Sequence, residues 1–288
     1  AGIGGVALAV ACLHRGIPFT LYERDSSFDV RSQGYGLTLQ QAHKAMEELG
    51  INHLAESIIS TRHLVHSPEG KVLGEWGMRK WMQQATKTKE PKRTNAHIAR
   101  QALRRALLQQ LGTDSSLQWN HQLIAIKNTD QEGLQLQFLV DGQEKQCHAD
   151  LIVGADGIRS VVRKLLIKEE RSPLRYLDCM VILGICPLKA LDNLRSDLLD
   201  SATVFQTANG HERIYVMPFD AQSVMWQLSF PMSEDEARAR SAQGAEALKN
   251  EARRRLPWHS PIPEILAATD PTLISGYPVY DREGLEAD

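Results

Sequence analysis

Residues 150–163 combine an acid, a hydroxyl and basic side chains around two glycines, in the order Asp-Leu-Ile-Val-Gly-Ala-Asp-Gly-Ile-Arg-Ser-Val-Val-Arg. We expect a short apolar strand at 151–153 to run into a tight turn that presents Asp156. Gly157 permits backbone angles that a side chain forbids, so the peptide N–H groups of this turn can approach an anion. The two arginines that follow favour the same partner. The segment is therefore predicted to contact a phosphate or a ribose.

The first residues, Ala-Gly-Ile-Gly-Gly-Val-Ala-Leu-Ala, resemble the second half of a glycine-rich nucleotide-binding turn. A complete dinucleotide fingerprint has a strand, the pattern Gly-x-Gly-x-x-Gly, a helix and an acid about 20 residues further on. Gly2 and Gly5 match the second and third glycines, with Gly4 between them, and Glu23 matches the acid. We expect Gly2 to let the backbone approach a pyrophosphate and Glu23 to bind a ribose hydroxyl. A tight strand–helix turn followed by an exposed glutamate is the alternative.

Two further arginines stand where they can contact phosphate. Arg31 precedes the loop 33–36, whose two glycines indicate either close approach of the backbone to a ligand or a sharp bend. Arg100 stands in the first turn of a predicted helix, where its charge opposes the helix dipole, and this position favours a nearby anion. For each of these arginines a solvated surface cation is an equal alternative. Arg104 and Arg105 are expected to face solvent.

The elements that must position these residues alternate between helices and strands in the first half of the chain. Apolar residues at helical spacing, followed by glycine, predict helices at 6–15, 40–49 and 96–111. Strand patterns occupy 17–22, 64–76, 117–127, 134–140 and 145–149, and 64–76 is split into a pair by Pro68-Glu69-Gly70. Asp141-Gly142, between the last two strands, is a strong hairpin signal.

The second half of the chain reads as an antiparallel sheet, with strands predicted at 176–186, 203–207, 213–219 and 223–230. A capping box at Ser233–Glu236 opens a helix that extends to Leu256, and the proline-rich remainder is expected to be irregular. This organisation predicts an α/β fold. A Rossmann-like nucleotide-binding domain is followed by a second, mostly antiparallel β-sheet domain that covers the nucleotide and shapes a substrate pocket.

Composition excludes several classes of function. A formal net charge of −2 over 288 residues argues against a general nucleic-acid binder. The basic segment 79–93 is expected to be a solvated loop, with contact to an acidic partner as the alternative. Four cysteines without Cys-x-x-Cys spacing, and histidines without a ligand cluster, indicate no metal site and favour the cytoplasm or another reducing compartment. The longest apolar runs are too short for a transmembrane segment.

Taken together, the separated motifs resemble the single-component FAD-dependent aromatic hydroxylases, monooxygenases with the para-hydroxybenzoate hydroxylase-like fold. The resemblance covers essentially the whole chain and rests on Ala1–Ala9, Tyr22–Asp25, Arg31 with Gly34 and Gly36, Arg100 with Leu103 and Leu107, Asp150–Arg163, Met217–Phe219, Trp226–Pro231 and Tyr280–Arg282. It implies a discontinuous FAD-binding domain and a substrate domain. The first comprises 1–70 and 95–168, with 281–288 returning to it, and the second comprises 71–94 and 169–280.

The same resemblance assigns residues to FAD: Glu23 to the adenosine ribose, Arg24, Arg31 and Arg100 to the phosphates and ribityl chain, the backbone near Leu123 to the adenine, and Asp156 and Gly157 to the pyrophosphate. It implies that NADPH or NADH reduces the flavin and that dioxygen then gives a C4a-hydroperoxide, whose distal oxygen passes to a small, aromatic substrate. This scheme requires no side-chain nucleophile or general base, so no catalytic residue is assigned. Tyr215, Met217 and Trp226 are candidates for lining the substrate pocket, and core packing is the alternative for each.

In this family a Gly-Asp motif and a helix that faces the flavin follow a segment such as Tyr280–Arg282. Because the sequence stops at Asp288 and lacks the first strand of the fingerprint, we expect a fragment truncated at both ends, which binds flavin weakly or not at all by itself. Three alternatives to the monooxygenase remain. They are an epoxidase or reductase of the same fold, an NAD-dependent dehydrogenase, and a non-catalytic fragment. The sequence does not indicate the oligomeric state.

Overall fold

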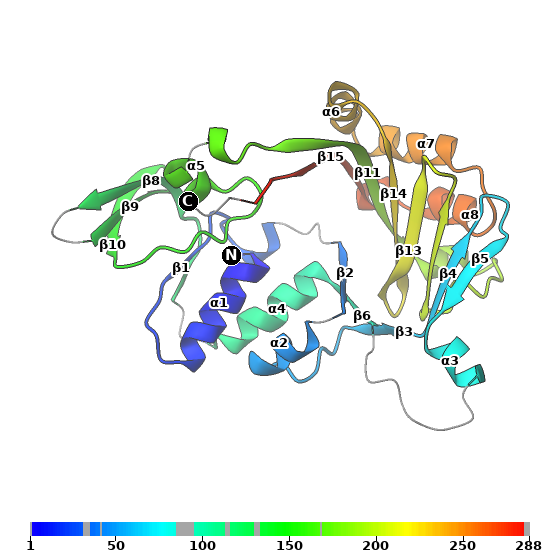
Figure 1. Ribbon diagram of the computed structural model, residues 1–288, viewed down its shortest axis with the longest axis horizontal. Helices are drawn as coiled ribbons and strands as arrows, with labels where there is room; N and C mark the ends of the chain where they lie inside the picture. The colour runs from blue at the N-terminus through cyan, green and yellow to red at the C-terminus, as the bar shows by residue number, and fades with distance from the viewer. Residues whose placement is uncertain are drawn as a thin grey trace.

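A computed structural model of the chain describes residues 2–30, 35–40, 42–84, 95–112, 116–129, 133–167 and 169–284. Figure 1 shows two lobes joined by extended strands, one built on the helices α1 and α4 and the other on a large sheet. The mixed α/β organisation with a large, mostly antiparallel sheet confirms the predicted fold class.

The first lobe carries the glycine-rich turn at the start of α1 (Ile3–His14). Its other elements are β1 (Leu21–Tyr22), a 3-10 turn at Phe28–Val30, β2 (Gly36–Leu39), α2 (His43–Glu48), β3 (Ile58–Ser60), β6 (Asn95–Ala99), α4 (Arg100–Gln110) and β7 (Leu117–Gln118). As predicted, α1 ends before Gly16, whose φ of +63° suits glycine. Val6 of α1 packs with Leu103 and Leu107 of α4 in one buried cluster. The pairing of β1 with β7 is parallel.

The helix predicted at 96–111 begins only at Arg100, so this prediction was wrong for its first turn. Asn95–Ala99 form the strand β6, which lies between β2 and β3 and pairs antiparallel with both. His97 and Ile98 on this strand are 0% and 1% exposed. Pairing on both edges satisfies the backbone of the strand, and this long-range gain outweighs the local helical pattern.

An antiparallel meander follows, formed by β8 (Gln122–Thr129), β9 (Gly133–Val140) and β10 (Gln143–Ala149). The predicted hairpin at Asp141-Gly142 is confirmed, because both residues have positive φ, +50° and +78°, as a two-residue turn of this kind requires. The single strand predicted at 117–127 is divided into β7 and β8 by a turn at Asn120, where φ is +59°.

The apolar segment 151–153 was predicted to be a strand, but the described structure assigns none there. Its Leu151 and Val153 side chains are 77% and 57% exposed. A strand needs a neighbouring strand to complete its ladder of hydrogen bonds, and apolar sequence alone does not provide one. The segment leads into α5 (Val161–Ile167) and a 3-10 turn at Glu169–Arg171.

The second lobe is built on a seven-stranded sheet with the strand order β15-β11-β14-β13-β12-β4-β5. Its strands are β4 (Arg62–His66), β5 (Val72–Trp76), β11 (Arg175–Pro187), β12 (Thr203–Ala208), β13 (Arg213–Asp220), β14 (Ser223–Pro231) and β15 (Ile274–Asp281). The antiparallel strands predicted for the second half are confirmed as β11 to β14, and among the described pairings of this sheet the one between β4 and β12 is parallel. The predicted domain boundary at residue 70 stays a prediction, although the pairing places β4 in this sheet.

The helices and turns of this lobe are α3 (Met78–Gln84), a 3-10 turn at Leu188–Leu191, α6 (Glu234–Ala242), α7 (Ala245–Arg255), α8 (Ile262–Ala268) and a 3-10 turn at Pro271–Leu273. Figure 1 places α6, α7 and α8 together on one face of the sheet. The single helix predicted from Ser233 to Leu256 was wrong, because Gly244, with φ +85°, separates α6 from α7. The region after Leu256 is also not irregular. Its strand β15 tolerates Pro278 because it lies at the edge of the sheet.

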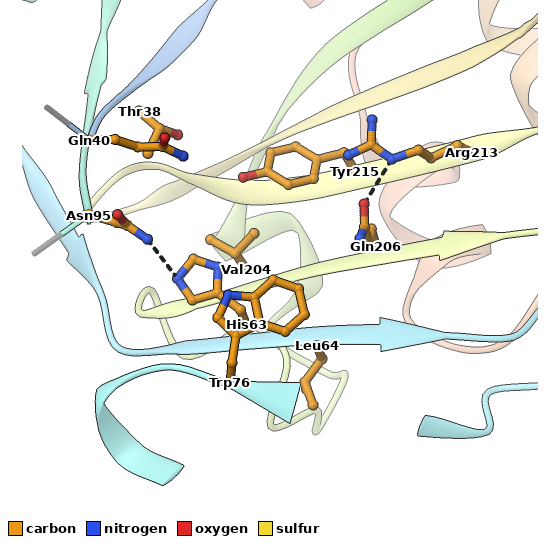
Figure 2. Close-up of a pocket in the computed structure, with 10 residues that line it drawn as sticks. All are labelled: Thr38, Gln40, His63, Leu64, Trp76, Asn95, Val204, Gln206, Arg213 and Tyr215. Atoms are coloured by element: carbon orange, nitrogen blue, oxygen red, sulfur yellow. Dashed lines mark hydrogen bonds between the residues drawn. The ribbon is translucent and has the colours of Figure 1, made fainter. Parts of the chain in front are cut away.

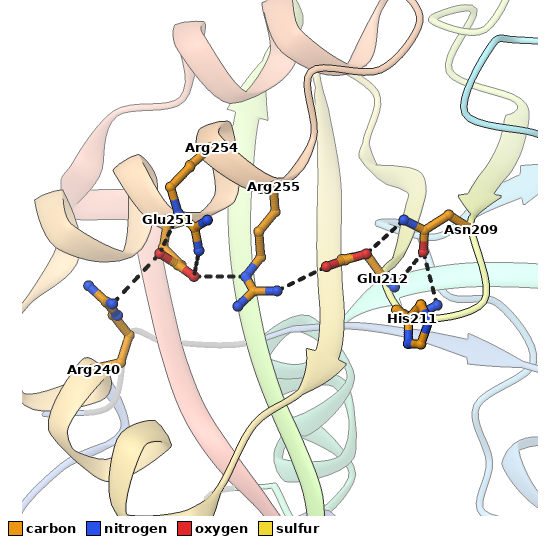
Figure 3. A network of polar contacts seen from close by, with 7 residues as sticks. All are labelled: Asn209, His211, Glu212, Arg240, Glu251, Arg254 and Arg255. Carbon is orange, nitrogen blue, oxygen red and sulfur yellow. Dashed lines mark hydrogen bonds and ion pairs between the residues drawn. The ribbon is translucent and has the colours of Figure 1, made fainter.

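A network of charged side chains attaches α7 to the turn between β12 and β13 (Figure 3). Glu251, whose side chain is 4% exposed, accepts hydrogen bonds from Arg254 and Arg255 at 2.7 Å each. Arg255 also donates to Glu212 at 2.9 Å and lies 3.9 Å from the centre of the Phe230 ring. A buried carboxylate is stable only when it is paired in this way. The network therefore fixes the helix on the sheet.

The described residues also bear on membrane-crossing helices, metal sites and the state of the cysteines. No helix among them combines the length and apolar composition needed to cross a membrane. No group of three or more histidine, cysteine or acidic side chains in the described ranges is arranged to hold a metal ion. All four cysteines are free thiols.

Candidate cofactor and substrate site

The start of α1 lies between β1 and the segment that precedes α5, so the two glycine-rich motifs meet in space. A Cβ atom added to Gly5 would lie 3.4 Å from the Cβ of Ala155 and 3.5 Å from the Cδ1 of Leu21. One added to Gly2 would lie 3.8 Å from the carbonyl oxygen of Ala155, whereas Gly4 has nothing within 4 Å. The fold therefore brings together two motifs that are about 150 residues apart in the sequence.

The N-terminus of α1 provides donors for an anion. The first bond within the helix runs from the Val6 N–H to the Gly2 carbonyl, at 3.0 Å, which leaves the N–H groups of Ile3, Gly4 and Gly5 without helical acceptors. The first turn of this twelve-residue helix carries no acidic residue. The positive end of the helix dipole therefore favours a phosphate at this position.

The carboxylate of Asp156 is engaged with the start of α5. It accepts a hydrogen bond from the Ser160 hydroxyl, and its Oδ2 accepts from the N–H groups of Val161 and Val162 at 2.7 and 3.2 Å. Gly157 has a φ of +83°, as the tight turn predicted here requires. Asp156 thus holds the turn in shape, and the backbone of the turn is the part that faces the glycines of α1.

Glu23 follows β1 directly, and its main chain is held by β7 through a hydrogen bond from its N–H to the Gln118 carbonyl, at 2.9 Å. Oε1 accepts from the Asp25 N–H at 3.0 Å, and Oε2 lies 3.7 Å from Nη2 of Arg104. The expectation that Arg104 faces solvent was wrong, because this residue is only 6% exposed. Arg105, in contrast, is exposed as expected.

The structure describes three of the four remaining residues expected at FAD. Arg24 and Arg100 are exposed, and the Arg100 N–H donates to the Tyr35 carbonyl at 2.8 Å, which ties the start of α4 to the loop before β2. Leu123 lies on β8 and packs in the small core of the meander. Arg31 lies outside the described residues.

A cavity of about 340 Å³ opens between the large sheet and the ends of β2 and β6 (Figure 2). Its polar walls comprise Thr38 and Gln40, His63 of β4, Asn95 of β6, and Gln206, Arg213 and Tyr215 of β12 and β13. The indole of Trp76, stacked on the His63 ring at 5.4 Å, forms an aromatic wall. Of the described lining residues, only Arg213 carries a formal charge at neutral pH. The cavity therefore suits a flat molecule with hydrogen-bonding or anionic groups.

Behind the cavity wall, side chains from four strands form a continuous hydrogen-bonded chain. Thr38 Oγ1 lies 3.0 Å from Nδ1 of His97, and Nε2 of His97 lies 2.7 Å from the Ser60 hydroxyl. The Ser60 hydroxyl lies 3.1 Å from Nε2 of His63, which is also 3.3 Å from Nδ2 of Asn95. We call these five residues the histidine relay. Both of its ends, at Thr38 and at His63 with Asn95, reach the cavity.

Burial keeps the imidazoles of the relay neutral. It lowers the pKa of His97 to about 4, with a smaller contribution from His63, and it also lowers the pKa of His63. Burial raises the pKa of the Tyr215 hydroxyl, although the hydrogen bond between Tyr215 and Thr38 and the charge of Arg213 offset part of this effect. At neutral pH every member of the relay can therefore both donate and accept a proton, apart from the Asn95 amide, which donates.

Of the residues predicted to line the substrate pocket, Tyr215 lines this cavity. Met217 is 2% exposed and fills the space beside Gly36, where an added Cβ would fall 2.4 Å from its Cε. Trp226 is fully buried, and its Nε1 donates to the Thr269 hydroxyl at 2.9 Å, so it belongs to the core of the large sheet. The relay was not found from the sequence, because its members come from four separate strands and share no local motif.

Comparison with known proteins gives the family. The family model described as "FAD binding domain" matches residues 1–271. The FAD-dependent monooxygenase thnD of Trichoderma harzianum is 28% identical over 204 residues, which are 66% of this chain and 43% of that protein. The aurachin C monooxygenase/isomerase of Stigmatella aurantiaca is 27% identical over 284 residues, 98% of this chain and 67% of that protein. The match thus spans less than half the length of the FAD-dependent monooxygenase thnD.

Solved structures show the same fold. The structure of Klebsiella pneumoniae HpxO in complex with FAD and uric acid has a TM-score of 0.76 and 20% identity, and the match covers 98% of this chain and 67% of that one. The residues of this chain also fit an adenine dinucleotide, because a helix N-terminus without acids and a fixed acid after the following strand are the two contacts that such a ligand requires. The chain belongs to the family of FAD-binding domains found in FAD-dependent monooxygenases.

Proposed function

We propose that this chain is the FAD-binding and substrate-binding part of a monooxygenase that inserts one atom of dioxygen into a small aromatic substrate, with NADPH or NADH as the reductant. The observation that carries the proposal is the cavity of Figure 2, which combines an aromatic wall, one cation and a neutral proton relay. The family match and the names of the relatives support the same class of reaction.

On this proposal the first lobe holds the nucleotide half of FAD. The N–H groups at the start of α1 bind the pyrophosphate, Glu23 accepts from the ribose hydroxyls, and Arg24, Arg31 and Arg100 contact the phosphates and the ribityl chain. Asp156 keeps the second turn in shape against Gly2. Bound FAD supplies the transfer of electrons from the nicotinamide and the activation of dioxygen. The protein contributes binding, orientation and control of protons.

In the cavity, a hydroxyl group of the substrate donates to Oγ1 of Thr38 and is held beside the hydroxyl of Tyr215. Thr38 in turn donates to Nδ1 of His97, and the proton shift continues through Ser60 to Nε2 of His63. Removing the proton raises the electron density of an aromatic ring, which is what an electrophilic oxygen donor attacks. Arg213 compensates the negative charge that this step creates.

The test is product formation with labelled dioxygen. The protein is titrated with FAD, flavin fluorescence is followed, and the loaded protein is incubated with NADPH or NADH, a panel of phenols and ¹⁸O₂. The proposal expects one ¹⁸O atom in the hydroxylated product and faster NAD(P)H oxidation when substrate is present. Turnover that leaves the label entirely in water indicates an oxidase or a reductase instead.

A further inference from the structure

Arg104 is a buried cation in the middle of a basic sequence. The residue is 6% exposed, although it lies on α4 between Arg100 and Arg105, which are both exposed. Its guanidinium carbon lies 5.0 Å from the centre of the Phe28 ring and 5.5 Å from the centre of the Trp119 ring. Both aromatic residues lie in turns, one before β2 and one between β7 and β8. The two rings hold the guanidinium in an aromatic clamp.

A buried guanidinium costs free energy unless polar groups compensate it. Arg104 meets this requirement at the site of the predicted ribose contact. Its Nη2 lies 3.7 Å from Oε2 of Glu23, and its Nη1 donates to Gln101 at 3.5 Å. The other oxygen of Glu23 accepts the N–H of Asp25 at 3.0 Å. Both oxygens of the Glu23 carboxylate are thus held by the protein, while the side chain remains 13% exposed.

We infer that Arg104 is the positioning residue for the ribose of the bound adenine dinucleotide and acts through the carboxylate of Glu23. This inference rests on the proposed function. Each carboxylate oxygen has two lone pairs, so it can accept one donor from the protein and one ribose hydroxyl. The ion pair and the Asp25 N–H fix the carboxylate plane before the ligand arrives, which removes the entropic cost of ordering it on binding.

Arg105 provides a matched control on the same helix. Its guanidinium carbon lies 5.2 Å from the centre of the same Phe28 ring, but the residue is exposed. Within the described part of the chain, the ion pair to Glu23 comes from Arg104. A general effect of removing positive charge or an aromatic contact should therefore follow from either substitution, whereas an effect on the ribose should follow from Arg104 alone.

The test measures how strongly the protein prefers ADP to 2′-deoxy-ADP, by isothermal titration calorimetry. Because a hydrogen bond to a charged group is worth roughly 1.5–3 kcal/mol, we expect the unaltered protein to prefer ADP by about tenfold or more. Arg104→Met should reduce this preference to about threefold or less, and Arg105→Met should leave it unchanged. Glu23→Gln should also reduce the preference. In the Glu23→Gln background, Arg104→Met should cause no further loss, because the two residues act through one contact.

Several results would overturn the inference. One is an undiminished preference for ADP in Arg104→Met, and another is a second, additive loss in the double variant. If Arg104→Met does not fold, as judged by circular dichroism, Arg104→Lys and Phe28→Leu replace it. These variants keep the charge or the ion pair, and the inference requires an intermediate preference from both. An unaltered protein that binds ADP and 2′-deoxy-ADP equally well contradicts the ribose role of Glu23 itself, and hence that part of the proposed function.

Discussion

Nδ2 of Asn95 lies 3.3 Å from Nε2 of His63, and this contact sets the direction of the whole histidine relay. An amide NH₂ group can only donate, so Nε2 of His63 is the acceptor in the resting protein and the proton of the neutral ring lies on Nδ1. The Ser60 hydroxyl, 3.1 Å from the same nitrogen, therefore donates to it and must accept from Nε2 of His97. Nδ1 of His97 is then left to accept from Thr38. The order Thr38, His97, Ser60, His63 is thus the order in which a proton can move.

The first prediction concerns the entry of the relay. Thr38→Val keeps the shape of the side chain but removes the hydroxyl that gives a proton to His97. Because positioned proton transfer contributes about 10²–10⁴-fold to rate, we expect product formation to fall by about 100-fold, with little change in FAD affinity. Steady-state kinetics from pH 6 to pH 9 measure this effect, and substrates that are already ionised should be affected least. Thr129→Val, on β8 of the meander, is the matched control.

An equal loss of rate for ionised and neutral substrates in Thr38→Val would show that Thr38 shapes the cavity without moving a proton. The same kinetics applied to Asn95→Leu provide a second check. Removal of the amide frees the tautomer of His63, so the rate should fall while the free energy of unfolding changes by no more than about 1 kcal/mol.

The second prediction concerns the acid stability of the fold. The pKa of His97 is lowered to about 4 in the folded protein by burial and by His63. Because an unfolded histidine titrates near 6.5, the unfolded state binds more protons between pH 6.5 and pH 4, and the free energy of unfolding must fall as the pH falls through that range. A fully neutral, buried histidine of this kind accounts for a loss of about 3 kcal/mol. Urea denaturation at a series of pH values measures it.

His97→Gln should flatten this dependence on pH, although the variant starts from a lower stability at pH 7.5. His53→Gln, at an exposed position, should retain the slope of the unaltered protein. If the slope is the same in all three proteins, the acid sensitivity comes from groups other than His97.

The third prediction concerns the selectivity of the cavity for charge. Arg213 donates to Oε1 of Gln206 at 2.8 Å, and its guanidinium carbon lies 5.3 Å from the centre of the Tyr215 ring, so its position at the cavity wall is fixed. Arg213→Met removes the only formal charge among the described lining residues. We expect KM for aromatic carboxylates to rise about tenfold and KM for the matching carboxamides to stay within about twofold. Equal changes in KM for both series would argue against Arg213 as an anion contact.

The fourth prediction concerns the network in Figure 3. Burial alone raises the pKa of Glu251, but the hydrogen bonds from Arg254 and Arg255 outweigh it and hold the pKa below its ordinary value. The carboxylate therefore contributes stability at neutral pH, and that contribution is lost as the pH falls through its lowered pKa. Glu251→Gln should lower the free energy of unfolding by about 2 kcal/mol, less than for a fully buried pair because the arginines are partly exposed.

Chemical denaturation at pH 7.5 measures the effect of Glu251→Gln, and Glu246→Gln, at an exposed site on the same helix, should change the stability by less than about 0.5 kcal/mol. Because the network joins α7 to the turn after β12, rather than to the cavity, ligand affinities should not change. If Glu251→Gln leaves the free energy of unfolding unchanged, solvent replaces the ion pairs of Glu251 without loss of stability.

The features that the sequence determined by itself are those whose physical cause is local. The hairpin at Asp141-Gly142 follows from the positive φ that its two residues tolerate, and the antiparallel strands from 203 to 230 follow from alternation and turn residues. The spacing of Gly2, Gly5 and Glu23 also reflects one helix and the strand that follows it. These patterns involve neighbours along the chain, so the amino-acid order contains them directly.

Tertiary structure alone decided the features that depend on pairing between distant segments. Asn95–Ala99 became a strand because β2 and β3 supply partners on both edges, and that strand brings His97 to Thr38 and Ser60. Arg104 became buried because the turns that carry Phe28 and Trp119 fold over it. The pattern of residues along the sequence does not indicate which strands are neighbours in the sheets. The burial of Arg104, the lowered pKa of His97 and the geometry of the relay all depend on that arrangement of strands.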